Sequence, residues 1–224
     1  VHEYEELGRL MSLMTGDEKH SAAATSTLDV IWALYDQVLR IDPTRLDDPA
    51  RDRFLLSKGH GPMAYYAVLA AKGFIDLDTL TSFATYESPL GHHPDSNLVP
   101  GVEIASGSLG HGLPIAVGLA IGLRARGNPA RVYVLLGDGE LDEGSNHEAI
   151  AVAGRRHLDN LTAIVLDNQS ASRGWPGGIQ GRFSVEGWAA RRVNGRNHEA
   201  LTQALTTPHD GRPLAVVATT ESGQ

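Results

Sequence analysis

RVYVLLGDGELDEGSNHEAIAVAGRRHLDNLTAIVLDNQ, residues 131–169, holds the most regular pattern of the chain. It begins with a β-branched, apolar run at 131–136 and closes with a second one at 161–166, which leads into Asp167-Asn168-Gln169. Small and apolar residues recur between the two runs at helical spacing, so a helix is expected over 141–156. Near-continuous apolar strands joined by a helix are typical of parallel strands that are covered on both faces. The pattern therefore predicts an α/β fold, a doubly wound parallel sheet with helices on both faces.

The rest of the chain supplies further elements of the same two kinds. Ser26 or Thr27, followed by an apolar stripe of helical spacing up to Val38, predicts a capped helix. Segment 88–114 lacks periodicity and is rich in Gly, Pro and His, which in a compact domain favours a functional loop. The other expected elements are helices at 5–14, 63–72, 76–86, 114–126 and 198–206, a loop at 172–181, and strands at 188–193 and 214–218.

Composition and charge exclude several classes of function. The chain has 224 residues, with 27 acidic against 19 basic side chains and a formal charge of −8, which argues against a nucleic-acid partner. It contains no Cys, which excludes disulfides, thiolate metal sites and a Cys nucleophile. No apolar run approaches the roughly 18 residues of a membrane span, and no signal-peptide core is present, so we expect a cytoplasmic location without a membrane partner. The length predicts a single domain over residues 1–224.

Asp138 and Asn168 each follow one of the two central strands. A right-handed crossover places both just beyond the carboxyl ends of neighbouring parallel strands, where open α/β sheets bind ligands. A carboxylate, an amide oxygen and a backbone carbonyl near Ser170 form an oxygen donor set that suits Mg²⁺ or Ca²⁺ together with a phosphate group. Gly139 allows its N–H to approach a phosphate at the start of a helix. The alternative is a plain turn, with Asp138 as helix cap and Asn168 as turn residue.

Four motifs in the chain resemble those of the transketolase family. Gly137-Asp138-Gly139 with Asn168 downstream resembles the thiamine-diphosphate motif, and the similar strings are GDGELDEGSNHEA at 137–149, SKGH at 57–60, GHHPD at 91–95 and SGSLGHGLPIAVG at 106–118. The resemblance covers nearly the whole chain, but a full transketolase is considerably longer. It therefore implies the N-terminal, diphosphate-binding subunit of a split, thiamine-diphosphate-dependent transketolase-like enzyme. A separate pyrimidine-binding chain would be the partner, in an α₂β₂ assembly.

The resemblance also implies which residues bind the cofactor and its metal. Mg²⁺ or Ca²⁺ would be held by Asp138, the side chain of Asn168 and the carbonyl of Ser170. The residues that would line the thiamine diphosphate, mainly through their backbone, are Gly107, Leu109 and Gly139, with His60 near the diphosphate.

The catalytic residues implied by the resemblance are His20, His60, His93 and Glu143. Imidazoles suit the reaction because they titrate near neutral pH and the hydroxyl protons of a ketose must be moved. His93 would contact the donor ketose, and Glu143 would meet the partner's activating glutamate across the subunit interface. The reaction would transfer a two-carbon ketol unit from a ketose donor to an acceptor.

Two other functions are weighed against this one. The first is the α-subunit of a 2-oxo-acid dehydrogenase E1-type enzyme, which would use the same cofactor and pass an acyl unit to a carrier. The second is a non-catalytic scaffold subunit with a vestigial cofactor site. The SKGH and His-Pro-Asp motifs and Glu143 favour transketolase over the first, and the intact Asp138, Gly139 and Asn168 set argues against the second. Ser21-Ala22-Ala23-Ala24 departs from the family pattern after His20, which makes an ordinary phosphosugar donor less expected.

Overall fold

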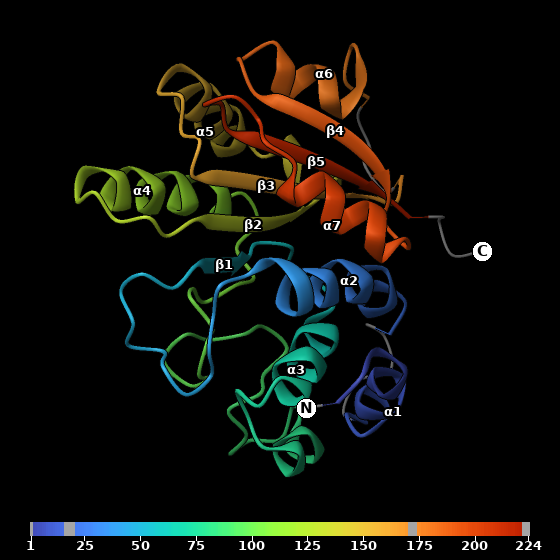
Figure 1. Ribbon diagram of the computed structural model, residues 1–224. Helices are drawn as coiled ribbons and strands as arrows, with labels where there is room; N and C mark the ends of the chain where they lie inside the picture. The colour runs from blue at the N-terminus through green and yellow to red at the C-terminus, as the bar shows by residue number, and fades with distance from the viewer. Residues whose placement is uncertain (1, 16–20, 170–173, 221–224) are drawn as a thin grey trace.

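A parallel five-stranded sheet runs through the middle of the computed structural model, which describes residues 2–15, 21–169 and 174–220 (Figure 1). The strands lie in the order β1-β2-β3-β5-β4, and every neighbouring pair is parallel. They are β1 (Arg53–Leu56), β2 (Val132–Gly137), β3 (Leu161–Asp167), β4 (Ala189–Asn194) and β5 (Leu214–Thr219). The carboxyl ends of β1, β2 and β3 therefore lie next to one another at one edge of the sheet.

The central strands are buried on both faces. β2 pairs with β3 from Val132 and Leu161 through Gly137 and Leu166. Successive side chains of a strand point to opposite faces, and in β3 they alternate between the two apolar cores of the protein. Two buried surfaces explain why these strands are apolar at almost every position.

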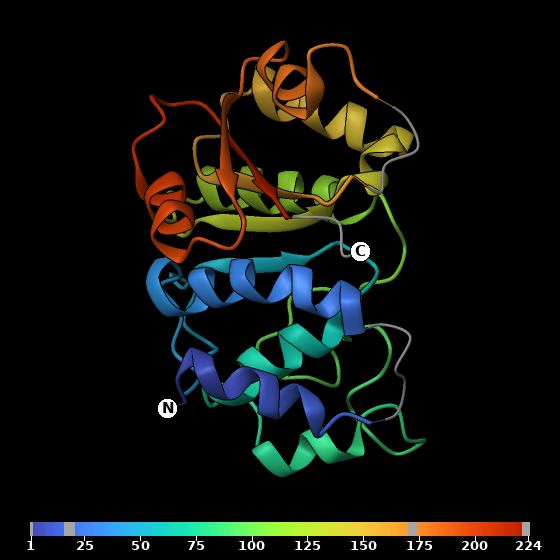
Figure 2. The same cartoon turned by 90° about the vertical axis from the view of Figure 1, so that its right-hand side faces the viewer.

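Helices cover the two faces of the sheet. One core joins α4 (Gly112–Ala125), α5 (Gly144–Arg155) and α6 (Gly178–Ser184) to the sheet. The other joins α1 (Leu7–Ser12), α2 (Ser21–Ala33), α3 (Pro62–Ala71) and α7 (His198–Thr206) to the opposite face. Figures 1 and 2 both show α1, α2 and α3 on the same side of the sheet. Shorter turns of helix are η1 (Tyr4–Glu6), η3 (Leu34–Val38), η4 (Leu77–Ser82) and η5 (Gly139–Asp142).

The predicted fold class is confirmed, since the sheet is parallel and helices cover both faces. Most predicted elements also occur within a few residues of the expected bounds. The single-domain prediction stays a prediction. Within the described ranges, no helix is long and apolar enough to cross a membrane.

Three local predictions were wrong. α2 begins at Ser21, ahead of the predicted cap, because the alanines of 22–24 are strong helix formers although they carry no apolar stripe. The helix expected over 76–86 is only the 3₁₀ turn η4, after which Phe83 turns back into the core. The loop expected at 172–181 contains the start of α6, whose buried Ile179 and Phe183 lie one helical turn apart.

Candidate cofactor site at the strand ends

The predicted metal-binding residues follow the carboxyl ends of adjacent strands. Gly137 is the last residue of β2, and the N–H of Asp138 donates to the carbonyl of Leu166 in β3 at 3.0 Å. Asn168 follows the last residue of β3. Asp138 and Asn168 therefore lie at the same edge of the sheet, as the crossover argument predicted. Their role as ligands stays a prediction.

The turn after β2 is closed by Asp138 itself. One carboxylate oxygen, Oδ1, accepts the N–H of Gly139 at 2.9 Å, and the side chain is only 3% exposed. This hydrogen bond is the one expected of the alternative, a plain helix cap. A carboxylate has two oxygens, so capping and metal binding are compatible roles for the same side chain.

Asp167, which immediately precedes Asn168, is engaged by a basic residue. Its Oδ2 lies 3.0 Å from Nη1 of Arg192 in β4, which is separated from β3 by β5. Across the part of the chain that the structure describes, no three His, Asp or Glu side chains gather closely enough to hold a metal. A metal here would need the mixed donor set predicted above, with one carboxylate, one amide oxygen and one carbonyl.

The loop of Gly107 brings two further predicted residues together. Gly107 has φ = +113°, and a Cβ built on it would lie 2.9 Å from Cγ of His93. The imidazole of His93 therefore rests against the backbone of Gly107, at a position that only glycine fits. Leu109 lies against Gly59, since its Cδ2 is 3.1 Å from a Cβ built there. The chain thus places Leu109 directly beside the loop of His60.

Glu143 lies beside the same loop, as the N-cap of α5. Its Cβ is 2.6 Å from a Cβ built on Gly110, and its side chain is exposed. The side chain makes no capping hydrogen bond to the helix. Glu143 is therefore placed to face outward from this edge, together with the exposed His60, His93 and Leu109. His20 and Ser170 lie outside the described residues.

Two buried charged residues at this edge were not predicted. Lys58, in the SKGH motif, is 9% exposed, and its Nζ donates to Oγ1 of Thr27 at 3.0 Å. Burial lowers the pKa of Lys58 to about 8, although the charges of Asp138 and Glu140 act in the opposite direction. Burial raises the pKa of Glu140, which is 3% exposed, against the effect of its hydrogen bonds from Ser57, Gly110 and Gly137.

A sequence signal for these residues was present. Both stand inside motifs that were recognised, SKGH and GDGELDEGSNHEA, and each lies just beyond a buried strand. A charged residue in such a turn is either solvated or paired inside the protein, and only the three-dimensional arrangement distinguishes the two.

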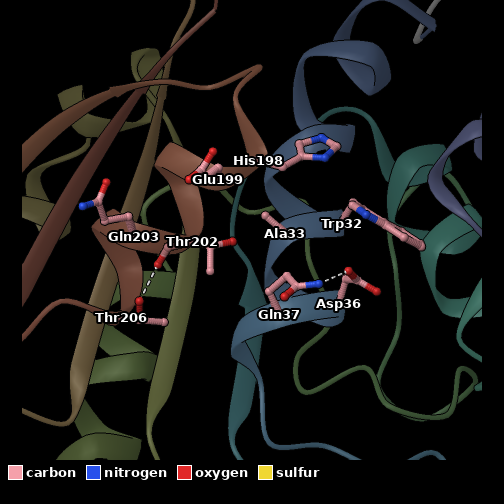
Figure 3. A pocket seen from close by; sticks show the side chains of 9 residues that line it. All are labelled: Trp32, Ala33, Asp36, Gln37, His198, Glu199, Thr202, Gln203 and Thr206. Carbon is pink, nitrogen blue, oxygen red and sulfur yellow. Dashed lines mark hydrogen bonds between the residues drawn. The ribbon is translucent and has the colours of Figure 1, made fainter.

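A separate groove of about 630 Å³ lies on the side of the molecule where α7 meets α2 and η3. Figure 3 shows Trp32, Ala33, Asp36 and Gln37 on one wall and α7 on the other. Of the predicted site residues that the structure describes, none lines this groove. It is therefore distinct from the strand-end site.

Comparison with known proteins identifies the family. The profile of the transketolase thiamine diphosphate binding domain matches residues 10–223 of this chain. The chain belongs to the transketolase family. Members of this family are thiamine-diphosphate-dependent transferases, so the predicted enzyme class is confirmed.

Several relatives are single subunits. The chain is 38% identical over 211 residues to one subunit of the apulose-4-phosphate transketolase of Actinobacillus succinogenes, covering 91% of this chain and 76% of that protein. It is 33% identical to 6-deoxy-6-sulfo-D-fructose transketolase subunit SqwG of Clostridium sp., covering 92% of this chain and 78% of that protein. Among solved structures, transketolase from Leishmania mexicana superposes with a TM-score of 0.80 at 28% identity, over 98% of this chain and 37% of that one. The chain thus spans just over a third of this solved transketolase.

One relative carries a different kind of name. The chain is 59% identical over 217 residues to "Ferredoxin fas2" of Rhodococcoides fascians, covering 96% of this chain and 71% of that protein. Iron–sulfur clusters of ferredoxins are held by cysteine thiolates. The 224 residues contain no Cys, and the transketolase thiamine diphosphate binding domain matches nearly all of them, so the similarity to this relative lies in that domain.

Proposed function

We propose that this chain is the diphosphate- and metal-binding subunit of a two-chain, thiamine-diphosphate-dependent transketolase-like enzyme. It would transfer a two-carbon ketol unit from a ketose donor to an acceptor. The observation that carries the proposal is the convergence of Asp138, Asn168 and the 57–60 and 107–112 loops at one edge of a transketolase-family sheet.

The donor set at this edge fits a divalent cation and a diphosphate. Asp138 and Asn168 offer hard oxygen ligands, and the carbonyl of Ser170 would be the third, which suits Mg²⁺ or Ca²⁺. Gly139 at the start of η5 and the backbone of Gly107 would approach the cofactor, because neither carries a side chain. When bound, thiamine diphosphate supplies a nucleophilic carbon and an electron sink for cleavage of a carbon–carbon bond.

The chain's own residues would bind the substrate and move its protons. His60 and His93 are exposed at this edge and would hold or accept protons at hydroxyl oxygens of the ketose. We assign the same kind of role to His20. Leu109, also exposed, would exclude water from one side of the cofactor, and Glu143 would face the activating glutamate of the partner.

The partner would be a separate chain with a pyrimidine-binding domain, in an α₂β₂ assembly. Relatives whose names designate one subunit of a transketolase support a partner, since such a name implies at least one other chain. The donor would be a ketose, for which relatives named for apulose 4-phosphate and 6-deoxy-6-sulfo-D-fructose are precedents outside common pentose phosphates. The cytoplasmic location stays a prediction.

The test starts from affinity capture of the tagged chain from its native lysate, in the presence of thiamine diphosphate and Mg²⁺. We expect mass spectrometry to identify a stoichiometric chain with a pyrimidine-binding domain. The purified complex should release an aldehyde from a ketose donor, and this release should depend on cofactor and metal. An acyl transfer to a carrier protein instead would support the 2-oxo-acid dehydrogenase alternative.

The Asp138→Ala variant distinguishes a catalytic, metal-dependent subunit from a non-catalytic scaffold subunit. We expect the variant complex to assemble, but its affinity for thiamine diphosphate in the presence of the metal should fall by about a hundredfold or more. Removing a group that only supports a metal ligand already lowers metal affinity by about tenfold to a hundredfold, and Asp138 would be a ligand itself. Asp78→Ala, at an exposed aspartate of η4, is the matched control and should leave turnover unchanged. Full turnover in the Asp138→Ala complex would show that the metal-site assignment is wrong.

A further inference from the structure

The carboxylate of Glu140 lies where three separate segments of the chain meet. The hydroxyl of Ser57 and the N–H of Gly110 donate to Oε1, the latter at 3.0 Å. The N–H of Gly137 donates to Oε2 at 3.3 Å. Ser57 follows β1, Gly137 ends β2, and Gly110 belongs to the 107–112 loop. One buried side chain thus connects two strand ends with the 107–112 loop, which leads into α4 and ends on its first residue, Gly112.

Ser57 extends this contact to the end of the loop. Its Oγ accepts the N–H of Gly112 at 3.1 Å. A Cβ built on Gly112 would overlap Cβ of Ser57, so the loop approaches the end of β1 more closely than any side chain would permit. From the other side, Oγ of Ser145 donates to the carbonyl of Gly110 at 2.6 Å. The loop is therefore held at Gly110 and Gly112 by three side chains from outside it, those of Ser57, Glu140 and Ser145.

A carboxylate is the side chain that fits this position. Three donors converge on Glu140, and an ionised carboxylate offers only acceptors and forms stronger hydrogen bonds than a neutral group. The ammonium of Lys58 is buried at the same edge, and the charges of Asp138 and Glu140 favour its ionised form. The backbone of Glu140 is fixed as well, since Nδ2 of Asn146 donates to its carbonyl at 2.7 Å.

We propose that Glu140 is the positioning residue of the 107–112 loop. Through Gly110 and Ser57 it sets where Gly107 and Leu109 lie relative to Asp138 and Gly139. Glu140 itself would not touch the cofactor, because its two oxygens are directed at the three donors. The consequence for cofactor binding rests on the proposed function, whereas the fixing of the loop does not.

Hydrogen–deuterium exchange on the full chain tests the loop directly. We expect Glu140→Ala to raise amide exchange at 107–112 by about tenfold or more, the equivalent of one lost hydrogen bond to a charged acceptor. Glu140→Gln should raise exchange less than Glu140→Ala does, because its amide oxygen can still accept from Gly110 and Ser57, although its NH2 group would face the N–H of Gly137. Glu148→Gln, an exposed glutamate on α5, should change nothing.

Peptides from β3 and β5 separate a local effect from general destabilisation. Their exchange should be the same in Glu140→Ala as in wild type. If Glu140→Ala does not fold, Ser57→Ala takes its place, and it should raise exchange at Gly112 through loss of that acceptor. Unchanged exchange at 107–112 in the folded variant would overturn the proposal.

A second measurement uses the assembled two-chain complex. In Glu140→Ala we expect the dissociation constant of thiamine diphosphate, measured by calorimetry with Mg²⁺, to rise by about tenfold to a hundredfold, the equivalent of one charged hydrogen bond. At saturating cofactor, the kcat of Glu140→Ala should stay within about threefold of wild type, and Glu140→Gln should restore part of the lost affinity. If Glu140→Ala lowered kcat as much as it lowered the affinity for thiamine diphosphate, and Glu140→Gln restored neither, a positioning role would be contradicted.

The two proposals fail in different ways. If the wild-type complex does not bind thiamine diphosphate while the loop exchanges as expected, the proposed function is wrong and the positioning role of Glu140 stands. If cofactor binds and Glu140→Ala alters neither exchange nor affinity, the positioning role is wrong and the proposed function stands.

Discussion

Gly107 shows how a single position controls the candidate site. Its φ of +113° and the 2.9 Å separation between a built Cβ and Cγ of His93 mean that any side chain here would strain the backbone and displace an imidazole. Gly118, in the exposed part of α4, is the opposite case, because a Cβ built there meets nothing within 4 Å.

We predict that Gly107→Ala lowers the free energy of unfolding by about 2 kcal/mol, the cost of a strained backbone conformation. Gly118→Ala should raise the free energy of unfolding by about 0.5 kcal/mol, because alanine restricts the unfolded chain and favours the helix. Urea denaturation of both variants measures these changes. A lower free energy of unfolding for Gly118→Ala would indicate that this face of α4 is covered. An unchanged free energy of unfolding for Gly107→Ala would indicate that the loop adapts to the new side chain.

Single residues also mark how far sequence alone could lead. Asp138 and Asn168 were correctly placed because a repeating strand–helix–strand pattern fixes where strands end. The partners of Glu140 could not be predicted, since its bond with Ser57 spans 83 positions and depends on which loop crosses the edge. A pattern along the chain contains no information on that crossing.

At the scale of secondary-structure elements, the side chain of Asp29 in α2 connects this helix with η1 and with the start of α7, both distant in sequence. Tyr4 of η1 donates from its hydroxyl to Oδ1 at 2.6 Å, and Nη1 of Arg196 lies 2.8 Å from Oδ2. Nε2 of His198, at the start of α7, lies 2.7 Å from Oδ1. Asp29 is 4% exposed, so this cluster connects α2 with both η1 and α7 inside the protein.

We predict that Asp29→Asn lowers the free energy of unfolding by about 1.5 kcal/mol at pH 7, because the hydrogen bonds from Tyr4, Arg196 and His198 would then end on a neutral group, while the half-exposed Arg196 stays solvated. Burial opposes ionisation of Asp29, but hydrogen bonds from Tyr4, Arg196 and His198 outweigh it and hold the pKa below its ordinary value of 3.8. The stability from the ionised form is therefore complete above that value and is lost as pH falls through the lower, folded pKa.

Urea denaturation between pH 7 and pH 3 measures this dependence. The wild type should lose stability over the acidic end of that range, and Asp29→Asn should lose less. Asp78→Asn, at an exposed aspartate, serves as the control at each pH. Parallel pH profiles for wild type and Asp29→Asn would show that Asp29 does not titrate as proposed.

The elements that sequence predicted poorly share a physical cause. α2 extends over alanines that have helix propensity but no apolar periodicity, and α6 stands in a Gly- and Pro-rich stretch where only Ile179 and Phe183 indicate a buried face. Strands β2 and β3, in contrast, are buried on both sides and are apolar throughout. Sequence patterns predict elements well where burial is continuous and poorly where it is confined to one or two contacts.

For the molecule as a whole, the described residues of the candidate site lie along the edge of the sheet formed by the carboxyl ends of β1, β2 and β3. His60, His93, Leu109 and Glu143 are exposed there, which is consistent with a cofactor covered by a second chain.

We predict that the isolated chain binds thiamine diphosphate at least about a hundredfold more weakly than the two-chain complex, equivalent to about 2.7 kcal/mol. The reason is that the pyrimidine half of the pocket would belong to the partner. Calorimetry with Mg²⁺ on the chain alone and on the complex gives both constants. Tight, metal-dependent binding by the chain alone would contradict a shared site.

The connection between β1 and β2 has a consequence for folding. These strands are neighbours, yet residues 57–131 separate them, whereas 138–160 separate β2 from β3 and 195–213 separate β4 from β5. Loop-closure entropy grows with the length of the connection, so docking β1 onto β2 costs about 1 kcal/mol more than joining β2 to β3. Residues 57–60 and 107–112 both belong to that long connection. The strand ends that hold Asp138 and Asn168 can therefore assemble when β2 pairs with β3, across a short connection. The loops that complete the edge take their places only when β1 pairs with β2, which has the longest sequence separation of these three pairings.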